Sequence, residues 1–400
     1  MTHSDIAIVG GGIVGLATAY TLVTSRSDLS LTIFEKESDI SQHQTGHNSG
    51  VLHSGIYYKP GSLKAKNCRE GKRRLEKFCA EERVPFEICG KVIIAVNNEE
   101  LATLKQIYQR GLDNNVTCEL INQKKLRDLE PKAAGIAAIH VPETGIVDFN
   151  MVAKKMATRV TSVISNHIHL STKVTQIQNS EDCVVITTPS GEHRTRLVIN
   201  CAGLHCDRVT SFTEKPKAKI IPFRGEYYEL QPEAHHLCRN LIYPVPNPEF
   251  PFLGVHFTRM IHGGVECGPN AVLAFAREGY SRFQLNVNDL AETLSYSGFR
   301  KMALKYWRTG LSEMWRSFSK RAFVRSLQRL VPEVQARHLK AVPAGVRAQA
   351  IAPDGHLLDD FLIQEAPRSI NVMNAPSPAA TSCLNIGRLI VDKVNEKFDS

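Results

Sequence analysis

The feature that most constrains the fold is a run of glycines between two apolar segments near the start of the chain. Asp5–Val9 is almost wholly apolar, as in a strand buried on both faces of a parallel sheet. The run Gly10–Gly15 follows at once, and Leu16–Val23 has the composition of a helix. A second expected strand, Leu29–Phe34, ends at Glu35. A strand, a glycine turn, a helix and a strand within about 30 residues predict the βαβ unit of a dinucleotide-binding fold.

The glycines fit the pattern Gly-x-Gly-x-x-Gly, with Gly10, Gly12 and Gly15 at its fixed positions. The first permits a tight turn, the second lets the backbone approach a pyrophosphate, and the third lets the helix pack on the strand. The phosphate then meets the positive end of the helix dipole. Glu35 follows Gly15 by 20 residues, as expected for a carboxylate that binds an adenosine ribose. The alternative is a tight turn that binds nothing.

The next segment favours FAD over NAD. His43–Tyr58 combines small, hydroxyl and imidazole side chains at unusual density. Serine and threonine in such a loop can bind phosphate, and small residues can admit a flat ring. An ordinary polar surface loop is the alternative, although such loops rarely hold leucine, isoleucine and two tyrosines together.

A set of segments spread over the whole chain resembles one flavoprotein superfamily. These segments are Gly10–Gly15, His43–Tyr58, Pro60–Ala65, Pro222–Tyr227, Phe252–His256, Thr258–Met260, Gly268–Ala271, Pro343–Ala350 and Asn374–Ser382. The sequence resembles the FAD-dependent D-amino-acid-oxidase-like superfamily and, within it, the L-2-hydroxyglutarate dehydrogenases, also called oxidases. The resemblance implies an α/β chain, α+β overall, with a Rossmann-like FAD-binding domain and a substrate domain built on a mixed or antiparallel sheet. It also implies FAD-dependent oxidation of L-2-hydroxyglutarate to 2-oxoglutarate.

The FAD-binding domain is expected to be discontinuous, because strand and loop patterns of one open sheet recur in the middle and at the end of the chain. Thr195–Asn200 and Ser369–Met373 read as strands, and Ala379–Phe398 as a helix. We therefore assign 1–88, 148–210 and 342–400 to this domain, and 89–147 and 211–341 to the substrate domain. Strand candidates of the second domain are Lys91–Val96, Ile139–Pro142, Glu226–Leu230 and Gly263–Gly268, and the proline-rich Tyr243–Pro248 reads as an extended loop.

The motifs and the resemblance together give a set of expected FAD-binding residues. They are Gly10, Gly12, Ile13, Val14, Gly15, Glu35, Lys36, Thr45, Gly46, His47, Asn48, Ser49, Gly50, Val51, Val174, Ala202, Gly203, Ser377, Pro378, Ala379, Ala380 and Thr381. The resemblance implies that Val174 makes a backbone contact to adenine and that Ser377–Ser382 faces the flavin. Many relatives have glycines where this chain has Ala379 and Ala380. FAD is expected to be non-covalent.

Oxidation of a hydroxy acid needs a base for the hydroxyl proton, and histidine suits this role near neutral pH. His53 and His256 are the candidates because each lies inside a segment of the resemblance. His53 also falls where some superfamily members attach flavin covalently, which implies a position beside the ring. The sequence does not choose between the two as base, and either could instead be a structural histidine.

The two carboxylates of the substrate require cations, preferably arginine, which binds a carboxylate with two hydrogen bonds. Arg224, Arg259 and Arg347 are the candidates, with Arg224 and Arg347 the stronger. Tyr57 and Tyr58 are expected to supply a further hydroxyl, and core packing is the alternative for one of them. A solvated arginine or a surface ion pair is the alternative for each guanidinium.

Two other function classes stay open. An amine or amino-acid oxidase on the same fold would share the FAD motifs and act on a neutral amine. A non-catalytic nucleotide-binding protein is the more distant alternative. No metal site is expected, because none of the ten cysteines forms a Cys-x-x-Cys pair.

The net charge of +9 is concentrated in one segment. Gly298–Val331 holds nine basic residues against the single acid Glu313, together with both tryptophans, while the rest of the chain is nearly balanced. This mixture predicts a helical segment that lies on an anionic membrane surface, with electrons passing to a membrane quinone or to oxygen. A solvated basic face or a helix packed on the second domain is the alternative. Nucleic-acid binding is not expected, because basic residues are not in excess elsewhere.

The expected location is the cytoplasm, with docking on the inner face of the cell membrane. The chain starts without a basic segment followed by a signal-like apolar run, and no apolar run reaches about 18 residues.

Overall fold

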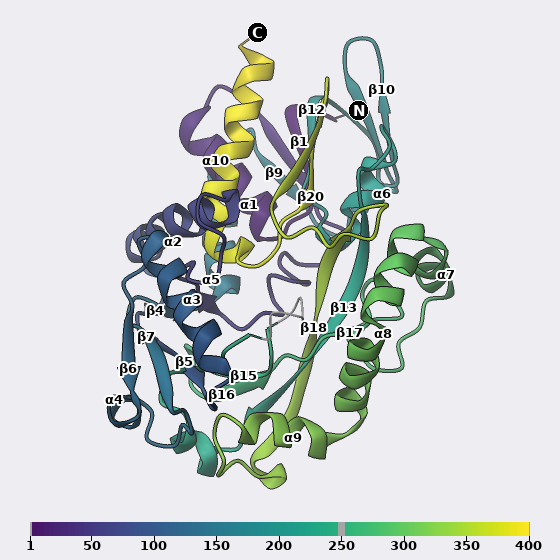
Figure 1. Ribbon diagram of the computed structural model, residues 1–400. Helices are drawn as coiled ribbons and strands as arrows, with labels where there is room; N and C mark the ends of the chain where they lie inside the picture. Colours follow the sequence, from purple (N-terminus) through teal and green to yellow (C-terminus); the bar gives the residue numbers. More distant parts are fainter. Residues whose placement is uncertain (1, 247–252, 400) are drawn as a thin grey trace.

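The computed structural model describes residues 2–246 and 253–399 and is built around two large sheets (Figure 1). The first sheet has the order β10-β11-β12-β1-β2-β9, with β20 paired to β12 and β19 to β20. Its strands are β1 (Thr2–Val9), β2 (Leu31–Phe34), β9 (His167–His169), β10 (Gln176–Asn179), β11 (Val184–Thr188), β12 (Gly191–Asn200), β19 (Leu362–Ala366) and β20 (Ser369–Asn374). Strands β12, β1, β2 and β9 run parallel, so their carboxyl ends meet at one edge.

Helices cover this sheet and supply its core. They are α1 (Ile13–Ser25), α2 (Leu63–Glu82), α5 (Phe149–Thr161) and α10 (Ala379–Phe398), which gather beside the sheet in Figure 1. The largest apolar cluster joins their buried faces to the strands. Gly387 lets α10 approach α1 closely, since a Cβ there would lie 2.7 Å from the Ala17 carbonyl oxygen. The sheet that carries the glycine turn is thereby held rigid from behind.

The second sheet is mixed, as expected. Its order is β17-β13-β16-β15-β14-β5-β7-β6, with β18 paired to β13. Its strands are β5 (Lys91–Ala95), β6 (Glu119–Asn122), β7 (Ala137–Val141), β13 (Lys219–Leu230), β14 (Leu241–Pro244), β15 (His256–Arg259), β16 (Val265–Gly268), β17 (Val272–Leu273) and β18 (Leu339–Ile351). Among the described strand pairs of this sheet, only β14 and β5 run parallel. A small third sheet joins β3 (Val51–Leu52), β8 (Gly145–Val147) and β4 (Phe86–Glu87).

Further helices flank the second sheet. They are α3 (Glu100–Asp113), α4 (Gln123–Leu129), α7 (Val287–Ser295), α8 (Ser297–Phe318) and α9 (Lys320–Gln328). The short helix α6 (Cys206–Thr210) lies between the two sheets, against β12, β20 and β13. In Figure 1, α7 and α8 run along one flank of the molecule, outside the long strands β13 and β18. The basic segment is therefore helical, as expected. No described helix combines the length and apolarity needed to span a bilayer.

Most expected strands and helices are present, with two differences. Tyr243 and Pro244 were expected in an extended loop, but they end β14, where Pro244 pairs with Ile94 of β5. The rest of that loop from 247 lies outside the described residues. The expected domain boundary at 342 falls inside β18, which pairs with β13 as far as Ile351. We therefore propose a boundary after Ile351.

Candidate active site

A cavity of about 970 Å³ opens where the parallel strands of the first sheet end. The segments that follow β1, β2, β12 and β20 all line it. Ligands in open α/β sheets bind at this edge, beyond the carboxyl ends of the strands. The cavity therefore lies where the βαβ unit predicts a dinucleotide.

The glycine turn has the geometry that a pyrophosphate needs. Gly10 has φ +112°, and a Cβ there would lie 2.5 Å from the Cys201 carbonyl oxygen. The first turn of α1 follows with no side-chain cap on Gly12 and no acidic residue. Its N-terminus faces the cavity through Gly12, Ile13 and Val14, and the helix dipole there favours an anion.

Buried polar groups around the turn also fit a dinucleotide. Glu35 accepts hydrogen bonds from the Gly11 and Glu37 amides at 2.7 and 2.9 Å, which fixes its carboxylate at the cavity wall. The hydroxyl of Ser41 lines the same cavity, is buried and has no hydrogen-bond partner among the described residues. An orphaned hydroxyl beside an open helix N-terminus is the arrangement that a bound phosphate would complete.

All but three of the expected FAD-binding residues line the cavity. The exceptions are Gly15, Gly46 and Gly50. Gly15 instead permits helix packing, since a Cβ there would lie 2.1 Å from the Gly10 carbonyl oxygen. A Cβ on Gly46 or on Gly50 would crowd the backbone of Ser41 or of Val147, respectively. These three glycines therefore shape the binding loops from behind.

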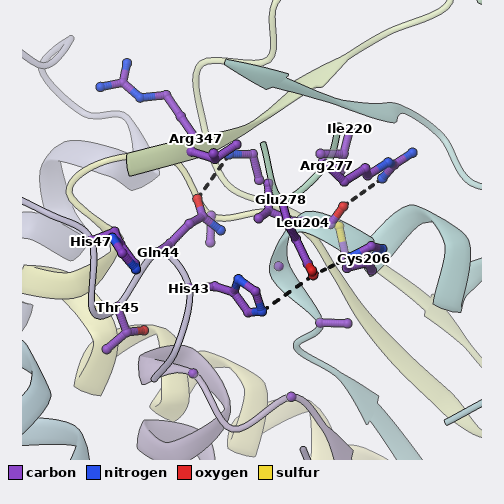
Figure 2. A pocket seen from close by; sticks show the side chains of 18 of the residues that line it. His43, Gln44, Thr45, His47, Leu204, Cys206, Ile220, Arg277, Glu278 and Arg347 are labelled. Atoms are coloured by element: carbon purple, nitrogen blue, oxygen red, sulfur yellow. Dashed lines mark hydrogen bonds and ion pairs between the residues drawn. The ribbon is translucent and has the colours of Figure 1, made fainter. Parts of the chain in front are cut away.

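The loop that begins at His43 is tied to the second sheet across the cavity. Gln44 accepts a hydrogen bond from the Ala348 amide on β18 at 3.1 Å, beside Arg347 (Figure 2). Its side-chain amide also lies 3.2 Å from where a Cβ on Gly203 would be. Gln44 was not singled out from the sequence, because a glutamine in a polar loop carries no recognisable signal.

A charged cluster closes one side of the cavity. His43 points toward Glu278 in Figure 2, and the Lys36 ammonium lies 2.7 Å from the Glu278 carboxylate. Glu37, His43 and Glu278 are close enough to share a metal ion. The Lys36 ammonium pairs with both carboxylates of this group.

The two candidate bases both lie in the interior. His53 lines the cavity, and its backbone amide donates to Thr381 Oγ1 at 3.2 Å, at the start of α10. Burial, reinforced by nearby positive charge from Lys91, lowers the pKa of His53 to about 3. His256 does not line the cavity; burial lowers its pKa to about 4 even though its Nδ1 donates to the Gly254 carbonyl at 2.9 Å. Both imidazoles are therefore neutral at physiological pH.

The structure separates the three candidate arginines. Arg347 lines the cavity and exposes its side chain to it. Arg224 was expected to reach the cleft, but it points to the opposite face of β13, where it donates to Glu226 at 3.2 Å and to the Ser281 carbonyl at 3.0 Å. Arg259 is paired with Glu87. Phe223, Gly225 and Tyr227 line the cavity, and strand alternation turns Arg224 away from it.

Behind His53 lies a residue that the sequence did not single out. Lys91 is 2% exposed, and its ammonium lies 4.7 Å from the ring centre of Tyr57 and 4.9 Å from that of Tyr243. The Tyr57 hydroxyl is buried and finds no hydrogen-bond partner in the described part of the chain. The sequence feature that could have identified it is a single lysine at the start of the otherwise apolar segment Lys91–Ala95.

Comparisons with known proteins agree with this geometry. The family model "FAD dependent oxidoreductase" matches residues 5–393. The L-2-hydroxyglutarate dehydrogenase of Indibacter alkaliphilus is 51% identical over 98% of this chain and 99% of its own. The Escherichia coli K12 protein of that name is 43% identical over 98% of this chain and 93% of its own. The human mitochondrial protein is 42% identical over 99% of this chain and 89% of its own.

Solved structures confirm the expected fold. L-α-glycerophosphate oxidase from Mycoplasma pneumoniae, with FAD bound, superposes with a TM-score of 0.81 at 22% identity over 99% of this chain and 95% of its own. Glycine oxidase from Geobacillus kaustophilus superposes with a TM-score of 0.74 at 16% identity, over 99% of this chain and 96% of its own. The expectation of FAD as cofactor is likewise confirmed. The chain belongs to the FAD-dependent oxidoreductase family, within its L-2-hydroxyglutarate dehydrogenase group.

Proposed function

We propose that this chain oxidises L-2-hydroxyglutarate to 2-oxoglutarate. The observation that carries the proposal is near-full-length similarity to proteins named for that activity, at 42–51% identity. When bound, FAD supplies the acceptor for the hydride that leaves the substrate's α-carbon. The chain's own residues must then bind a dicarboxylate, take the hydroxyl proton and keep water out.

We assign the proton transfer to His53. It is the candidate base that lines the cavity, and its neutral imidazole can accept a proton. The amide contact to Thr381 holds the backbone of this residue against the start of α10. His256 is then a neighbour that packs on the Tyr243 ring, with centroids 4.0 Å apart.

Arg347 is the proposed partner of the carboxylate next to the reacting carbon. Its guanidinium can form two parallel hydrogen bonds with that group, which fixes the α-carbon in one orientation. The Ala348 amide beside it is tied to Gln44 in the FAD-binding loop. This link holds the carboxylate-binding strand at a fixed place relative to the cofactor site.

Anaerobic mixing with the two enantiomers of 2-hydroxyglutarate tests the proposed reaction. We expect L-2-hydroxyglutarate to bleach the flavin absorbance of the holoprotein in a single turnover, and D-2-hydroxyglutarate to leave it unchanged. Bleaching by the D enantiomer alone, or by neither, contradicts the proposal. Bleaching by amino acids without any by 2-hydroxyglutarate supports the amine-oxidase alternative.

We also propose that α8 docks on the inner face of the cell membrane, with electrons leaving FAD for a membrane quinone. Leu304, Trp307, Leu311, Trp315 and Phe318 are each more than half exposed. α8 is kinked at Tyr306, and the four of these residues that follow the kink are three or four residues apart, which puts them on one side of the helix. An exposed apolar stripe of this kind favours a partner that is itself apolar.

The charges around the stripe favour an anionic lipid surface. The side chains of Lys305 and Arg308 lie over the neighbouring rings of Tyr306 and Trp307. Glu313, the acid of this segment, is 4% exposed; it accepts from the Ala271 amide and is paired with Arg316, so it offsets one of the nine cations. Each basic residue near an anionic leaflet contributes about 1 kcal/mol of attraction.

Vesicle binding tests the docking surface. The holoprotein is expected to co-sediment with vesicles containing phosphatidylglycerol at least ten times more strongly than with phosphatidylcholine vesicles. The double variant Trp307→Ser, Trp315→Ser should lose most of this binding, because the apolar stripe loses its two largest side chains. Ile164→Ser is the matched control, since Ile164 is 96% exposed outside the basic segment. Equal binding to both vesicle types overturns the proposal.

A further inference from the structure

A loop that belongs to the second sheet reaches across the cavity to the first sheet. This 275–286 loop leaves β17 and enters α7, and its two ends are tied by a hydrogen bond from the Asn286 amide to the Phe275 carbonyl at 3.1 Å. Its first part, Ala276–Glu278, lines the cavity. None of the expected FAD-binding residues lies in this loop. Its contacts therefore add a wall to the cofactor site that the sequence motifs do not describe.

Arg277 fixes the base of the 275–286 loop to the segment that follows β12. Arg277 is 3% exposed, and its guanidinium donates to the Leu204 carbonyl at 2.7 Å and to Asp207 Oδ2 at 2.8 Å. Its backbone amide donates to Asp289, in the first turn of α7, at 2.7 Å. Leu204 lines the cavity beside Gly203, an expected FAD-binding residue. The base of the loop is thus held against one wall of the cofactor site.

Glu278 joins the loop to two further parts of the cavity wall. Its carboxylate accepts from His205 Nε2 at 2.8 Å and lies 2.7 Å from the Lys36 ammonium. Both partners line the cavity, His205 after β12 and Lys36 after β2. The carboxylate also lies 3.5 Å from His43 Nε2, as Figure 2 shows. Although burial raises the pKa of Glu278, the hydrogen bonds from His205 and Lys36 lower it to about 2, so the carboxylate is ionised.

Tyr280 ties the same loop to the segment that begins at His43. The Tyr280 hydroxyl lies 2.7 Å from His43 Nδ1. The Tyr280 ring packs on the imidazole of His47, with centroids 4.6 Å apart. Both histidines line the cavity, and His47 is an expected FAD-binding residue. The loop thus holds three segments that are far apart in the sequence.

These contacts lie beside the groups expected to bind the ribose and the pyrophosphate. Lys36 directly follows Glu35, whose carboxylate is fixed at the cavity wall. His43 comes two residues before Thr45, whose hydroxyl accepts from the Ile13 amide at 2.9 Å, at the N-terminus of α1. A loop that closes over this part of the site meets the cofactor rather than the reacting end of the substrate.

We propose that the 275–286 loop retains FAD as a clasp, held shut by Glu278 and Tyr280. For FAD to leave at this wall, the loop must first separate from its partners on the first sheet, and the free energy of those contacts adds to the barrier to release. The contacts join protein groups to one another, so breaking them leaves the glycine turn intact. The inference does not depend on which substrate the chain oxidises.

The test measures the release of FAD from holoprotein of the Glu278→Gln variant. The holoprotein is diluted into buffer without FAD, and the flavin absorbance per chain is read after gel filtration at timed intervals. Glutamine keeps the shape of the side chain but loses the charge that pairs with Lys36. Release is expected to be at least tenfold faster than in the wild type, because charge-assisted hydrogen bonds are replaced by neutral ones.

Two companion variants grade the effect. Tyr280→Phe removes the hydroxyl contact to His43 and keeps the ring against His47, so release should be about fivefold faster, or ~1 kcal/mol. Glu278→Asp keeps the charge and should recover part of the retention. If Glu278→Gln is isolated without FAD, Tyr280→Phe carries the same comparison.

Glu82→Gln is the matched control for loss of an ion pair elsewhere. Glu82 accepts from Arg159 Nε at 2.7 Å and does not line the cavity. FAD release from Glu82→Gln should equal that of the wild type. Release that is equally fast in Glu82→Gln and Glu278→Gln overturns the proposal.

Two further readouts separate a clasp from a purely structural role. The Tm of the Glu278→Gln apoprotein should stay within about 2 °C of the wild type, because partly exposed ion pairs contribute little to stability. Raising NaCl to about 1 M, which screens such pairs, should speed release more in the wild type than in Glu278→Gln. Unchanged release in Glu278→Gln, or faster release with a large fall in apoprotein Tm, contradicts the role of the loop as a clasp.

Discussion

Replacing His53 with glutamine is expected to lower kcat for L-2-hydroxyglutarate by about 10²- to 10⁴-fold, the usual contribution of a general base. Glutamine keeps a polar side chain of similar length but cannot accept the hydroxyl proton at a basic nitrogen. FAD content should not change, because the hydrogen bond that ties this residue to α10 runs from its backbone amide to Thr381 Oγ1 and does not involve the imidazole. Rapid-mixing flavin reduction measures the rate, and flavin absorbance per chain measures the content.

Two companion variants identify the base. His256→Gln should lower the rate far less, since His256 does not line the cavity. His140→Gln should leave the rate unchanged, because His140 lies in β7, away from the cavity lining. A larger loss in His256→Gln than in His53→Gln reverses the assignment of the base.

The pH profile supplies an independent readout. Since burial brings the pKa of His53 to about 3, the imidazole stays neutral down to about pH 5. We therefore expect kcat/KM to show no decline between pH 8 and pH 6 on account of this group. An unperturbed histidine, with a pKa near 6.5, would already lose its basic form in that range.

The cofactor half of the site could be predicted from the sequence because its chemistry is local. A strand, a glycine turn and a helix N-terminus lie within one short segment, and Glu35 ends the next strand. Each of these residues is placed by its immediate neighbours along the chain. The structure accordingly brings nearly all of them to one cavity.

The substrate half could not be predicted in the same way because it depends on strand parity and long-range burial. Arg224 and Gly225 are adjacent on β13 yet face opposite sides of the sheet, and a one-residue change of register would exchange them. Lys91 begins a strand, where a lysine is normally solvated. Only the packing of β5 between two other strands buries it.

Substitutions in the glycine turn are expected to have the second large effect. Gly15 and Gly12 lack a side chain for different physical reasons. Gly15→Ala is expected to prevent formation of the holoenzyme. Its Cβ would lie 2.1 Å from the Gly10 carbonyl oxygen, a backbone atom that cannot move without separating α1 from β1. Overpacking of this kind costs about 3 kcal/mol or more, a large share of the stability of a domain. Soluble yield and Tm of the apoprotein measure the loss.

Gly12→Ala is the matched comparison, and its effect should fall on the cofactor alone. A Cβ there meets only the Thr45 hydroxyl at 3.4 Å, and Gly12 has an extended conformation that alanine adopts freely. The methyl group would instead occupy the space between the helix N-terminus and the pyrophosphate, so FAD affinity should fall about 100-fold, or ~2.7 kcal/mol. Apoprotein Tm should stay at the wild-type value. If Gly12→Ala lowered that Tm as much as Gly15→Ala, the division between a packing glycine and a phosphate-facing glycine would be wrong.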